Sequence, residues 1–329
     1  MLVAVRPRPR WAGRFAVCIV ALVLAAACSS GPGSPGTASP DTSPGRGTAG
    51  ATGPAPAAGG PAIPVLGTEN FYADLLAQIG GSRVSVSSLL NSPNADPHAF
   101  EASPQAAVAV ADARLVVVNG MGYDDFMRHL LSATPNANRV VITVQELLGL
   151  PSSANAHVWY DPATMPKVAR AIAQALAQLE PANAAYFEAR LSTCLASLQA
   201  LDERVASLRT RYAGTAVAFT EPVAGYLAEA IGLSVLTPEG FAHAIEVGTD
   251  PAPADVAAER DLLTHHRVRV LLYNNQAVTP LTTQIRQLAV ASGIPVVGVA
   301  ETMPPGYADY RAWMLATLDE LGAALAKGA

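Results

Sequence analysis

Residues 161–212 read DPATMPKVARAIAQALAQLEPANAAYFEARLSTCLASLQALDERVASLRTRY, a helical block with one interruption. Asp161 can cap its start, and Pro162 suits the first helical position, where a missing N–H costs nothing. Glu180-Pro181 predicts a break, because proline disfavours the helical conformation in the residue before it. The block therefore predicts two consecutive helices.

The second half of this block carries apolar side chains at helical spacing, with charged residues between them. These side chains belong to Tyr186, Leu191, Leu195, Leu198, Leu201, Val205 and Leu208. One interpretation is an amphipathic helix that covers a sheet. The other is a single rigid connector between two lobes, and the pattern fits both equally.

Short apolar runs on both sides of the block have the length and composition of buried strands. They are 63–66, 84–89, 115–118 and 140–144 before it, and 216–220, 268–273 and 295–299 after it. Their alternation with helical patterns predicts parallel sheets covered by helices. We therefore expect an α/β protein with an N-terminal lobe at 62–180, a connecting helix at 181–212 and a C-terminal lobe at 213–329.

The first 27 residues have the features of a signal peptide. Four arginines precede an almost unbroken apolar run from Phe15 to Ala27, which is too short to span a bilayer comfortably. Small residues before Cys28 resemble the bacterial lipobox, in which the cysteine is acylated after cleavage; the alternative is a plain secretory signal with an incidental cysteine. Residues 28–61 are rich in Gly, Pro, Ser and Thr and predict a flexible tether. We expect an extracytoplasmic lipoprotein anchored to the cell membrane.

The charge balance makes nucleic acid an unsuitable partner. The chain has 21 basic and 26 acidic residues, and removal of residues 1–27 takes away four arginines, so the formal net charge changes from 21 − 26 = −5 to 17 − 26 = −9. A negative surface repels a phosphate backbone. Cys194 is then the single cysteine besides Cys28, so we expect no disulfide and a buried thiol at Cys194.

Four potential metal ligands follow predicted strands: His98, His157, Glu221 and Glu301. In open parallel sheets, ligands bind outside the carboxyl ends of the strands, so two residues from each lobe would meet in the cleft between the lobes. Two neutral imidazoles and two carboxylates around a divalent cation leave no net charge, which lowers the cost of burying the ion. The set suits Zn²⁺ first and Mn²⁺ next.

Neighbouring polar residues have competing interpretations. Asp96 and Asp161 precede proline and can start turns, or they can orient a ligand histidine from behind. The region Tyr273-Asn274-Asn275-Gln276 can supply an oxygen ligand in place of Glu301, with Asn275 as the candidate.

A second group of possible ligands lies in a predicted helix. Glu239, His243 and Glu246 stand at positions i, i+4 and i+7, which brings them to one helix face. This face is either an accessory metal site or a solvated helix surface.

Two motifs resemble those of a known family, the cluster A-I (cluster 9) solute-binding lipoproteins of bacterial zinc and manganese ABC transporters. Residues 94–101 (NADPHAFE) are similar to its Asp-Pro-His-x-[Phe/Tyr]-Glu motif, and residues 157–162 (HVWYDP) are similar to its His-Val-Trp-Leu-Asp-Pro motif. The resemblance covers residues 62–327. It implies two Rossmann-like lobes, each a mainly parallel sheet, joined by a long rigid helix, with one metal ion in the cleft.

The resemblance also implies roles for residues and partners. His98 and His157 correspond to ligands of the N-terminal lobe, Glu221 stands where the family has histidine or glutamate, and Glu301 stands where it usually has aspartate. It implies a monomer that delivers Zn²⁺ or Mn²⁺ to an ABC permease with its ATPase.

Two other classes of protein remain as alternatives. A secreted metallohydrolase needs an open coordination position and a general base, whereas four protein ligands would close the site. A tethered surface or adhesion module is the third class, and failure to bind any metal tightly would favour it.

Overall fold

The computed structural model describes residues 56, 60–92 and 100–327, and residues 50–329 form one compact unit. The predicted signal peptide, Cys28, Asp96 and His98 lie outside the described residues, as does nearly all of the predicted tether. No helix within the described ranges is long and apolar enough to cross a membrane.

The first sheet has four parallel strands in the order β2-β1-β3-β4. The strands are β1 (Ile63–Glu69), β2 (Val84–Leu90), β3 (Leu115–Val118) and β4 (Val140–Thr143). The helices that follow them are α1 (Asn70–Gly80), α2 (Pro104–Asp112), α3 (Phe126–Ala133) and α4 (Val144–Leu148), with a 3₁₀ turn at Gly81–Arg83. All four strands were expected from their apolar runs.

The second sheet repeats this arrangement, with four parallel strands in the order β6-β5-β7-β8. The strands are β5 (Ala216–Phe219), β6 (Ser234–Val235), β7 (Leu271–Asn274) and β8 (Val296–Val299). Its helices are α7 (Gly225–Ile231), α8 (Glu239–Glu246), α9 (Pro253–Thr264) and α10 (Pro280–Ala291), with a 3₁₀ turn at Pro222–Ala224. The short exposed strand β6 was not predicted, because two residues give no periodic signal.

The helical block folds as two helices with the predicted break. Helix α5 (Thr164–Leu179) is followed by a 3₁₀ turn at Pro181–Asn183 and by the 29-residue helix α6 (Ala184–Tyr212). The expected cap was wrong: α5 begins at Thr164, and Asp161 instead accepts hydrogen bonds from the Ala163 N–H and the Thr164 hydroxyl, at 3.0 and 3.2 Å. A 3₁₀ turn at Val158–Tyr160 precedes this start and delays the helix.

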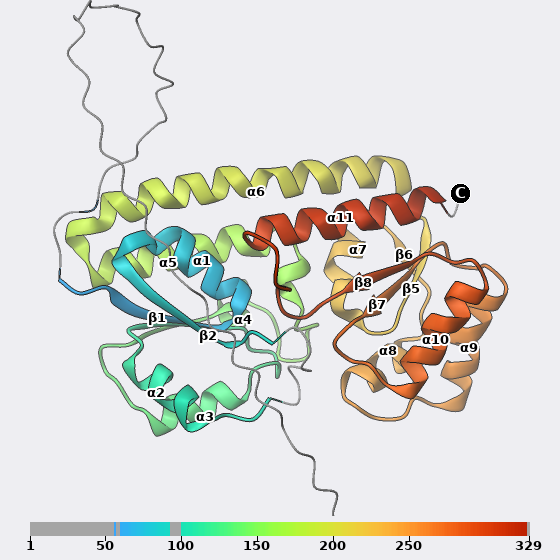
Figure 1. Cartoon of the computed structure of the whole chain (residues 1–329), viewed down its shortest axis with the longest axis horizontal. Coiled ribbons are helices and arrows are strands. Elements are labelled where there is room, and N and C mark those ends of the chain that lie inside the picture. Colours follow the sequence, from blue (N-terminus) through green and yellow to red (C-terminus); the bar gives the residue numbers. More distant parts are fainter. Residues whose placement is uncertain (1–55, 57–59, 93–99, 328–329) are drawn as a thin grey trace, which may run out of the picture. The chain divides into compact units, whose positions relative to one another are not determined.

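Helix α6 contacts elements from both halves of the chain. It packs against α1 and α5 of the first half, against α7 of the second, and along the last helix, α11 (Tyr310–Lys327) (Figure 1). Helix α11 also contacts α1 and β8. The two interpretations of this helix are therefore compatible, because α6 covers secondary structure and also links the two sheets.

The strands alternate their side chains between two cores, as a period of two requires. In the first sheet, Val65 and Val117 face the large core under α6, whereas Leu66 and Val116 face α2 and α3. The large core continues into the second half and includes Cys194, where burial raises the pKa of the thiol to about 11.

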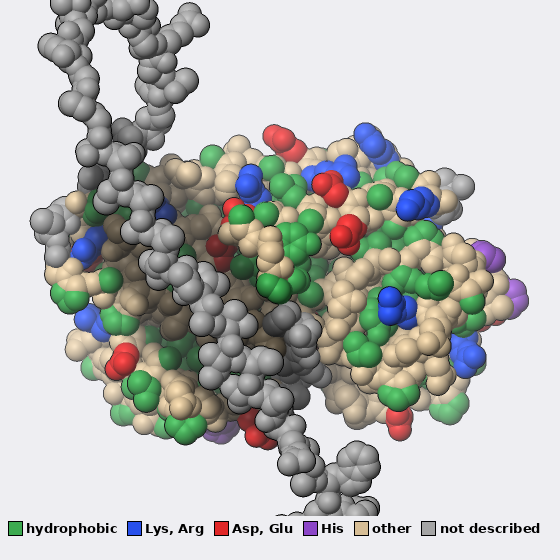
Figure 2. Space-filling view, viewed as in Figure 1, with side chains coloured by type: hydrophobic (Ala, Val, Ile, Leu, Met, Phe, Trp, Pro, Cys, Tyr) green, Lys and Arg blue, Asp and Glu red, His purple; other side chains and the backbone are tan. Residues whose placement is uncertain are grey.

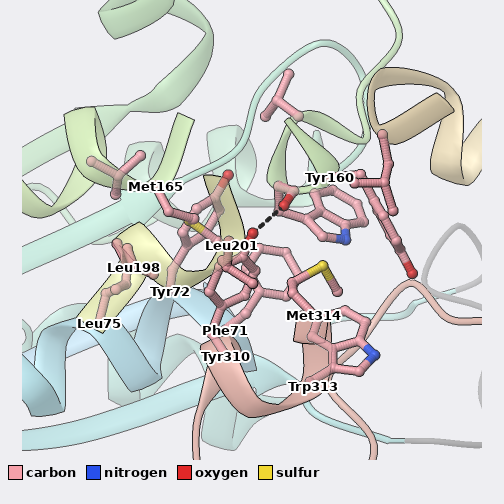
Figure 3. Close-up of a cluster of buried hydrophobic side chains, with 14 of the residues drawn as sticks. Phe71, Tyr72, Leu75, Tyr160, Met165, Leu198, Leu201, Tyr310, Trp313 and Met314 are labelled. Carbon is pink, nitrogen blue, oxygen red and sulfur yellow. Dashed lines mark hydrogen bonds between the residues drawn. The ribbon is translucent and has the colours of Figure 1, made fainter. Parts of the chain in front are cut away.

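An aromatic cluster lies at the junction of the two halves. Figure 3 shows Phe71, Tyr160, Tyr310 and Trp313 together, with the Tyr310 hydroxyl donating to the Trp159 carbonyl at 2.5 Å. Because Tyr310 and Trp313 belong to α11, this cluster fixes the last helix against the first half. The observed architecture confirms the predicted α/β fold of two parallel sheets and a long helix.

Candidate metal centre

His157 is completely buried, and its tautomer is fixed by Asn155. The Asn155 side-chain N–H₂ donates to the Pro222 carbonyl at 2.8 Å, which turns the Asn155 side-chain oxygen toward the imidazole. That oxygen lies 2.7 Å from His157 Nδ1 and cannot donate, so it accepts a hydrogen bond from the Nδ1–H group. A neutral imidazole with the proton on Nδ1 has its metal-binding lone pair on Nε2.

The Nε2 atom of His157 faces a carboxylate from the second half. Glu301 Oε2 lies 3.5 Å from it, and both side chains have no exposed surface. Two ligands of one tetrahedral Zn²⁺ ion, each about 2.1 Å from the metal, are about 3.4 Å apart. The pair therefore has the spacing of two ligands of a single ion.

Asn274, the last residue of β7, links this pair to Glu221. Its side-chain N–H₂ donates to Glu301 Oε1 at 2.7 Å and also to Glu221 Oε2, and all three side chains are buried. The backbone N–H of Gln276 donates to the Asn274 oxygen at 2.9 Å, which fixes the orientation of the amide. The amide thus presents partial positive charge to two carboxylates, as a bound cation would.

Side chains from both halves hold the loop after β8. The Gln276 side-chain oxygen accepts from the backbone N–H groups of Glu301 and Thr302, at 2.6 and 3.0 Å. The Tyr160 hydroxyl donates to the Ala300 carbonyl at 2.8 Å. These bonds position Glu301 on backbone that both halves support, which is the support that a preorganised site requires.

The predicted residues divide into two groups. His157, Glu221 and Glu301 come together, whereas His98 and Asp96 lie outside the described residues. Asp161 bonds the start of α5 and not His157. Asn275 is exposed and lines a different cavity, because neighbouring residues at a strand end point to opposite faces.

Of three residues that hold the site, Asn155 was not predicted, and Asn274 and Gln276 were predicted only as members of the region 273–276. Asn155 had a usable signal, since asparagine favours a turn in which its side chain accepts the N–H two residues later, here from His157 at 3.0 Å. The region 273–276 was named as a possible source of an oxygen ligand, whereas Asn274 bonds the two carboxylates and Gln276 bonds the loop of Glu301. The strand-end rule finds the region but does not select the side chain that points inward.

The described residues do not complete a metal site by themselves. Among them, no group of three or more His, Cys, Asp or Glu side chains could hold a metal ion. The arrangement supplies a buried imidazole and two carboxylates, with Asn274 between the two acids.

Buried acids and aromatic rings surround the site, and little of this region is exposed to water. Burial raises the pKa of Asp124 to about 6, although its carboxylate accepts from the backbone N–H groups of Asn119 and Gly120. Burial and the charge of Asp124 raise the pKa of Glu69. The Trp159 ring lies against the His157 ring, with centroids 5.1 Å apart, and Trp159 also stacks on Phe71. Apolar surroundings of this kind strengthen electrostatic interactions with a bound cation.

A cavity of about 850 Å³ adjoins the site between the two halves. Tyr123 and Asn155 from the first half and Phe219 and Glu246 from the second contribute to its wall. It is large enough to hold a hydrated ion.

Comparison with protein families gives a match over residues 65–324, to the family described as zinc-uptake complex component A, periplasmic. The chain belongs to this family. Its members are solute-binding components of zinc and manganese uptake systems, which agrees with the resemblance carried by the two histidine motifs.

The sequence identity to individual relatives is low. The manganese-binding lipoprotein MntA of Halalkalibacterium halodurans is 27% identical over 147 residues, which cover 44% of this chain and 49% of that protein. The chain thus spans about half the length of this curated relative.

Solved structures show the same fold. The periplasmic zinc-binding protein TroA from Treponema pallidum has a TM-score of 0.69 at 20% identity, covering 80% of this chain and 99% of that one. The solute-binding protein FpvC from Pseudomonas aeruginosa, in complex with Mn²⁺, has a TM-score of 0.68 at 21% identity, covering 82% and 100%.

Proposed function

We propose that this protein captures one divalent transition-metal ion outside the cytoplasmic membrane and delivers it to an ABC permease with its ATPase. The observation that carries this proposal is the approach of His157 Nε2 to Glu301 Oε2, 3.5 Å apart and fully buried, with Asn274 joining Glu301 to Glu221. The ion is cargo in this function, and the protein performs no chemistry on it.

The proposed ligands are His98, His157, Glu221 and Glu301. In this proposal His157, Glu221 and Glu301 supply three ligands, and His98 within the motif at 94–101 supplies the fourth. The contact of His157 with Glu301 and the bonds of Asn274 to both carboxylates support it. Two imidazoles and two carboxylates neutralise a divalent ion, which a site with no exposed surface requires.

The proposed order of preference is Zn²⁺ before Mn²⁺. Imidazole and carboxylate ligands accept both ions, and the intrinsic affinity order places Zn²⁺ above Mn²⁺ at such a site. Imidazole binds metal in its neutral form, so affinity should fall below about pH 6. A stripped sample that holds the ion equally well at pH 5 and about pH 7.5 would exclude a two-histidine site.

The proposed location is the outer face of the cell membrane, with Cys28 acylated and residues 28–61 acting as the tether. The lipobox-like residues before Cys28 support this part of the proposal. On the visible face in Figure 2, basic and acidic side chains are scattered among polar and apolar ones, in keeping with a small-ion ligand. Loss of membrane association in the Cys28→Ala variant tests the anchor.

The testing experiment is a competition titration of chelator-stripped protein (residues 29–329) with Zn²⁺ and Mn²⁺. The Glu301→Ala variant is measured beside it, and Glu320→Ala, in the exposed part of α11, is the matched control. Tight binding that Glu301→Ala weakens and Glu320→Ala leaves intact supports the proposal. Failure of both ions to bind tightly would remove it.

A further inference from the structure

Glu246 lies between a buried and an exposed histidine. Its Oε1 is 3.8 Å from Nδ1 of His157, and its Oε2 is 3.7 Å from Nδ1 of His243. The exposed fractions of the three side chains are 0% for His157, 19% for Glu246 and 69% for His243. Nitrogen and oxygen donors thus extend from the solvent to the Nδ1 edge of His157, the edge that Asn155 holds.

The outer pair has a fixed geometry on α8. His243 and Glu246 are separated by three positions and share one helix face, while Phe241 and Ile245 are buried in the core of the second sheet. The spacing of 3.7 Å between His243 Nδ1 and Glu246 Oε2 is close to the roughly 3.4 Å that separates two ligands of one zinc ion. Both residues also lie in the last turn of α8, where the helix dipole favours a cation.

The outer pair opens onto the cavity that adjoins the metal centre. His243 and Glu246 line the cavity of about 850 Å³, together with Asn155, the residue that fixes the His157 tautomer. Glu239 lines this cavity as well, but no three-ligand group with His243 and Glu246 forms among the described residues. The outer pair therefore offers two protein ligands, which suit weak and rapidly exchanging binding.

We propose that His243 and Glu246 form an outer, low-affinity site for a divalent transition-metal ion, which receives the ion before it reaches His157. This inference rests on the proposed function, since an inner site must exist for the ion to reach. Glu246 Oε2 faces His243 and Glu246 Oε1 faces the Nδ1 edge of His157, so the outer site lies beside the ring that belongs to the inner one. The outer site is an intermediate binding site and contributes no ligand to the final complex.

An intermediate binding site affects the rate constants of metal binding. Its loss slows association and dissociation by the same factor and leaves the dissociation constant unchanged. Stopped-flow mixing with Zn²⁺ follows this through the fluorescence of Trp159, whose ring lies against His157. For Glu246→Gln and for His243→Ala we expect both rate constants to fall about fivefold to tenfold.

Glu239→Gln is the matched control, because it removes the same charge from the same helix and the same cavity wall. An equal slowing in this variant would mean general electrostatic attraction and would overturn the outer site. A weaker dissociation constant in Glu246→Gln, caused by faster release alone, would make Glu246 a support of His157 and would also overturn it. Unchanged rates in both Glu246→Gln and His243→Ala would do the same.

A second measurement detects the outer site directly. In a variant with Glu221→Ala and Glu301→Ala, we expect residual weak binding of Mn²⁺, seen as paramagnetic broadening of the His243 imidazole signals. Adding His243→Ala or Glu246→Gln should abolish or sharply reduce the remaining binding. Absence of broadening at His243 would overturn this inference, whereas absence of tight Zn²⁺ binding by the unmodified protein would overturn the proposed function itself.

Discussion

His157 and Glu301 approach each other to 3.5 Å between Nε2 and Oε2, although one follows the first sheet and the other follows the second. Neither side chain has exposed surface. Two polar groups without access to water need strong mutual or ionic compensation. A cation bound at the junction of the two halves would therefore stabilise both buried side chains.

Removal of Asn155 should weaken metal binding without removing a ligand. The Asn155 side-chain oxygen accepts a hydrogen bond from the Nδ1–H group of His157 and so keeps the lone pair on Nε2. For Asn155→Ala we expect about a tenfold to hundredfold loss of Zn²⁺ affinity, as is common when the partner of a ligand histidine is lost. Competition titration with a chelator measures it.

The matched control is Asn155→Asp, which keeps an acceptor oxygen for Nδ1, loses the bond to the Pro222 carbonyl and adds a negative charge beside the imidazole. We expect it to retain most of the affinity. Equal affinity of Asn155→Ala and the unmodified protein would show that Asn155 does not govern the tautomer.

Replacement of Asn274 should destabilise the metal-free protein more than the loaded one. In the metal-free state its amide is the donor shared by Glu221 and Glu301, and a cation takes over that role on binding. For Asn274→Leu we expect a loss of about 2 kcal/mol in the free energy of unfolding of the stripped protein. The rise in melting temperature on addition of Zn²⁺ should therefore be larger than in the unmodified protein.

Asn275→Leu provides the comparison, because this neighbouring asparagine is exposed and lies away from the two carboxylates. It should change neither the stability of the stripped protein nor its response to Zn²⁺ to a comparable extent. A zinc response of the same size in both variants would argue against a shared-donor role for Asn274.

The sequence predicts the fold well because its central strands are apolar runs buried on both faces. Leu115–Val118 has four consecutive buried side chains, and a run of this kind is recognisable without any knowledge of its neighbours. The break at Glu180-Pro181 is equally local. Strand β6 is the opposite case, since its two exposed residues are a strand only because β5 lies beside them.

The candidate site was predictable to a lesser degree. The strand-end rule and the family motifs locate His157, Glu221 and Glu301, because each follows a recognisable apolar run. Asn274 and Asn275 have the same type of side chain at adjacent positions, and only the direction of the chain at the end of β7 decides which one reaches the carboxylates. That direction depends on the pairing of β7 with β5 and β8, which no local pattern contains.

Asn70 should control how fast the ion leaves. Its side chain donates to the Met303 carbonyl at 2.8 Å and accepts from the Met303 N–H at 2.9 Å, two residues beyond Glu301. These bonds hold the loop of Glu301 to the first half. For Asn70→Ala we expect release of Zn²⁺ to accelerate about tenfold, from the loss of two hydrogen bonds of about 1 kcal/mol each, partly offset by water.

Asn70→Asp separates the two bonds, since aspartate keeps the acceptor for Met303 N–H and loses the donor. Its release rate should lie between those of Asn70→Ala and the unmodified protein, as measured by stopped-flow with excess chelator. An unaltered release rate in Asn70→Ala would mean that this contact does not limit the opening of the site.

Glu259 should make the protein less stable at alkaline pH. This residue of α9 has no exposed surface, and among the described residues neither carboxylate oxygen has a well-formed hydrogen bond. Burial raises its pKa to about 8, and the neighbouring Thr237 hydroxyl, which already bonds the backbone of Phe219, offsets only part of that effect. The folded state thus favours the protonated carboxyl, whereas the unfolded chain ionises near its ordinary value of about 4.3.

The sign of the pH dependence follows from this difference. Between the unfolded pKa and about pH 8 the folded protein binds more protons than the unfolded one, so stability falls as the pH rises through that range. Glu259→Gln imitates the protonated carboxyl and should raise the free energy of unfolding at pH 8 by on the order of 2 kcal/mol, with little effect near pH 4. Urea unfolding of stripped protein at a series of pH values measures it. Glu320→Gln, on the exposed part of α11, should leave the pH dependence unchanged, and an equally steep dependence in Glu259→Gln would assign the effect to another group.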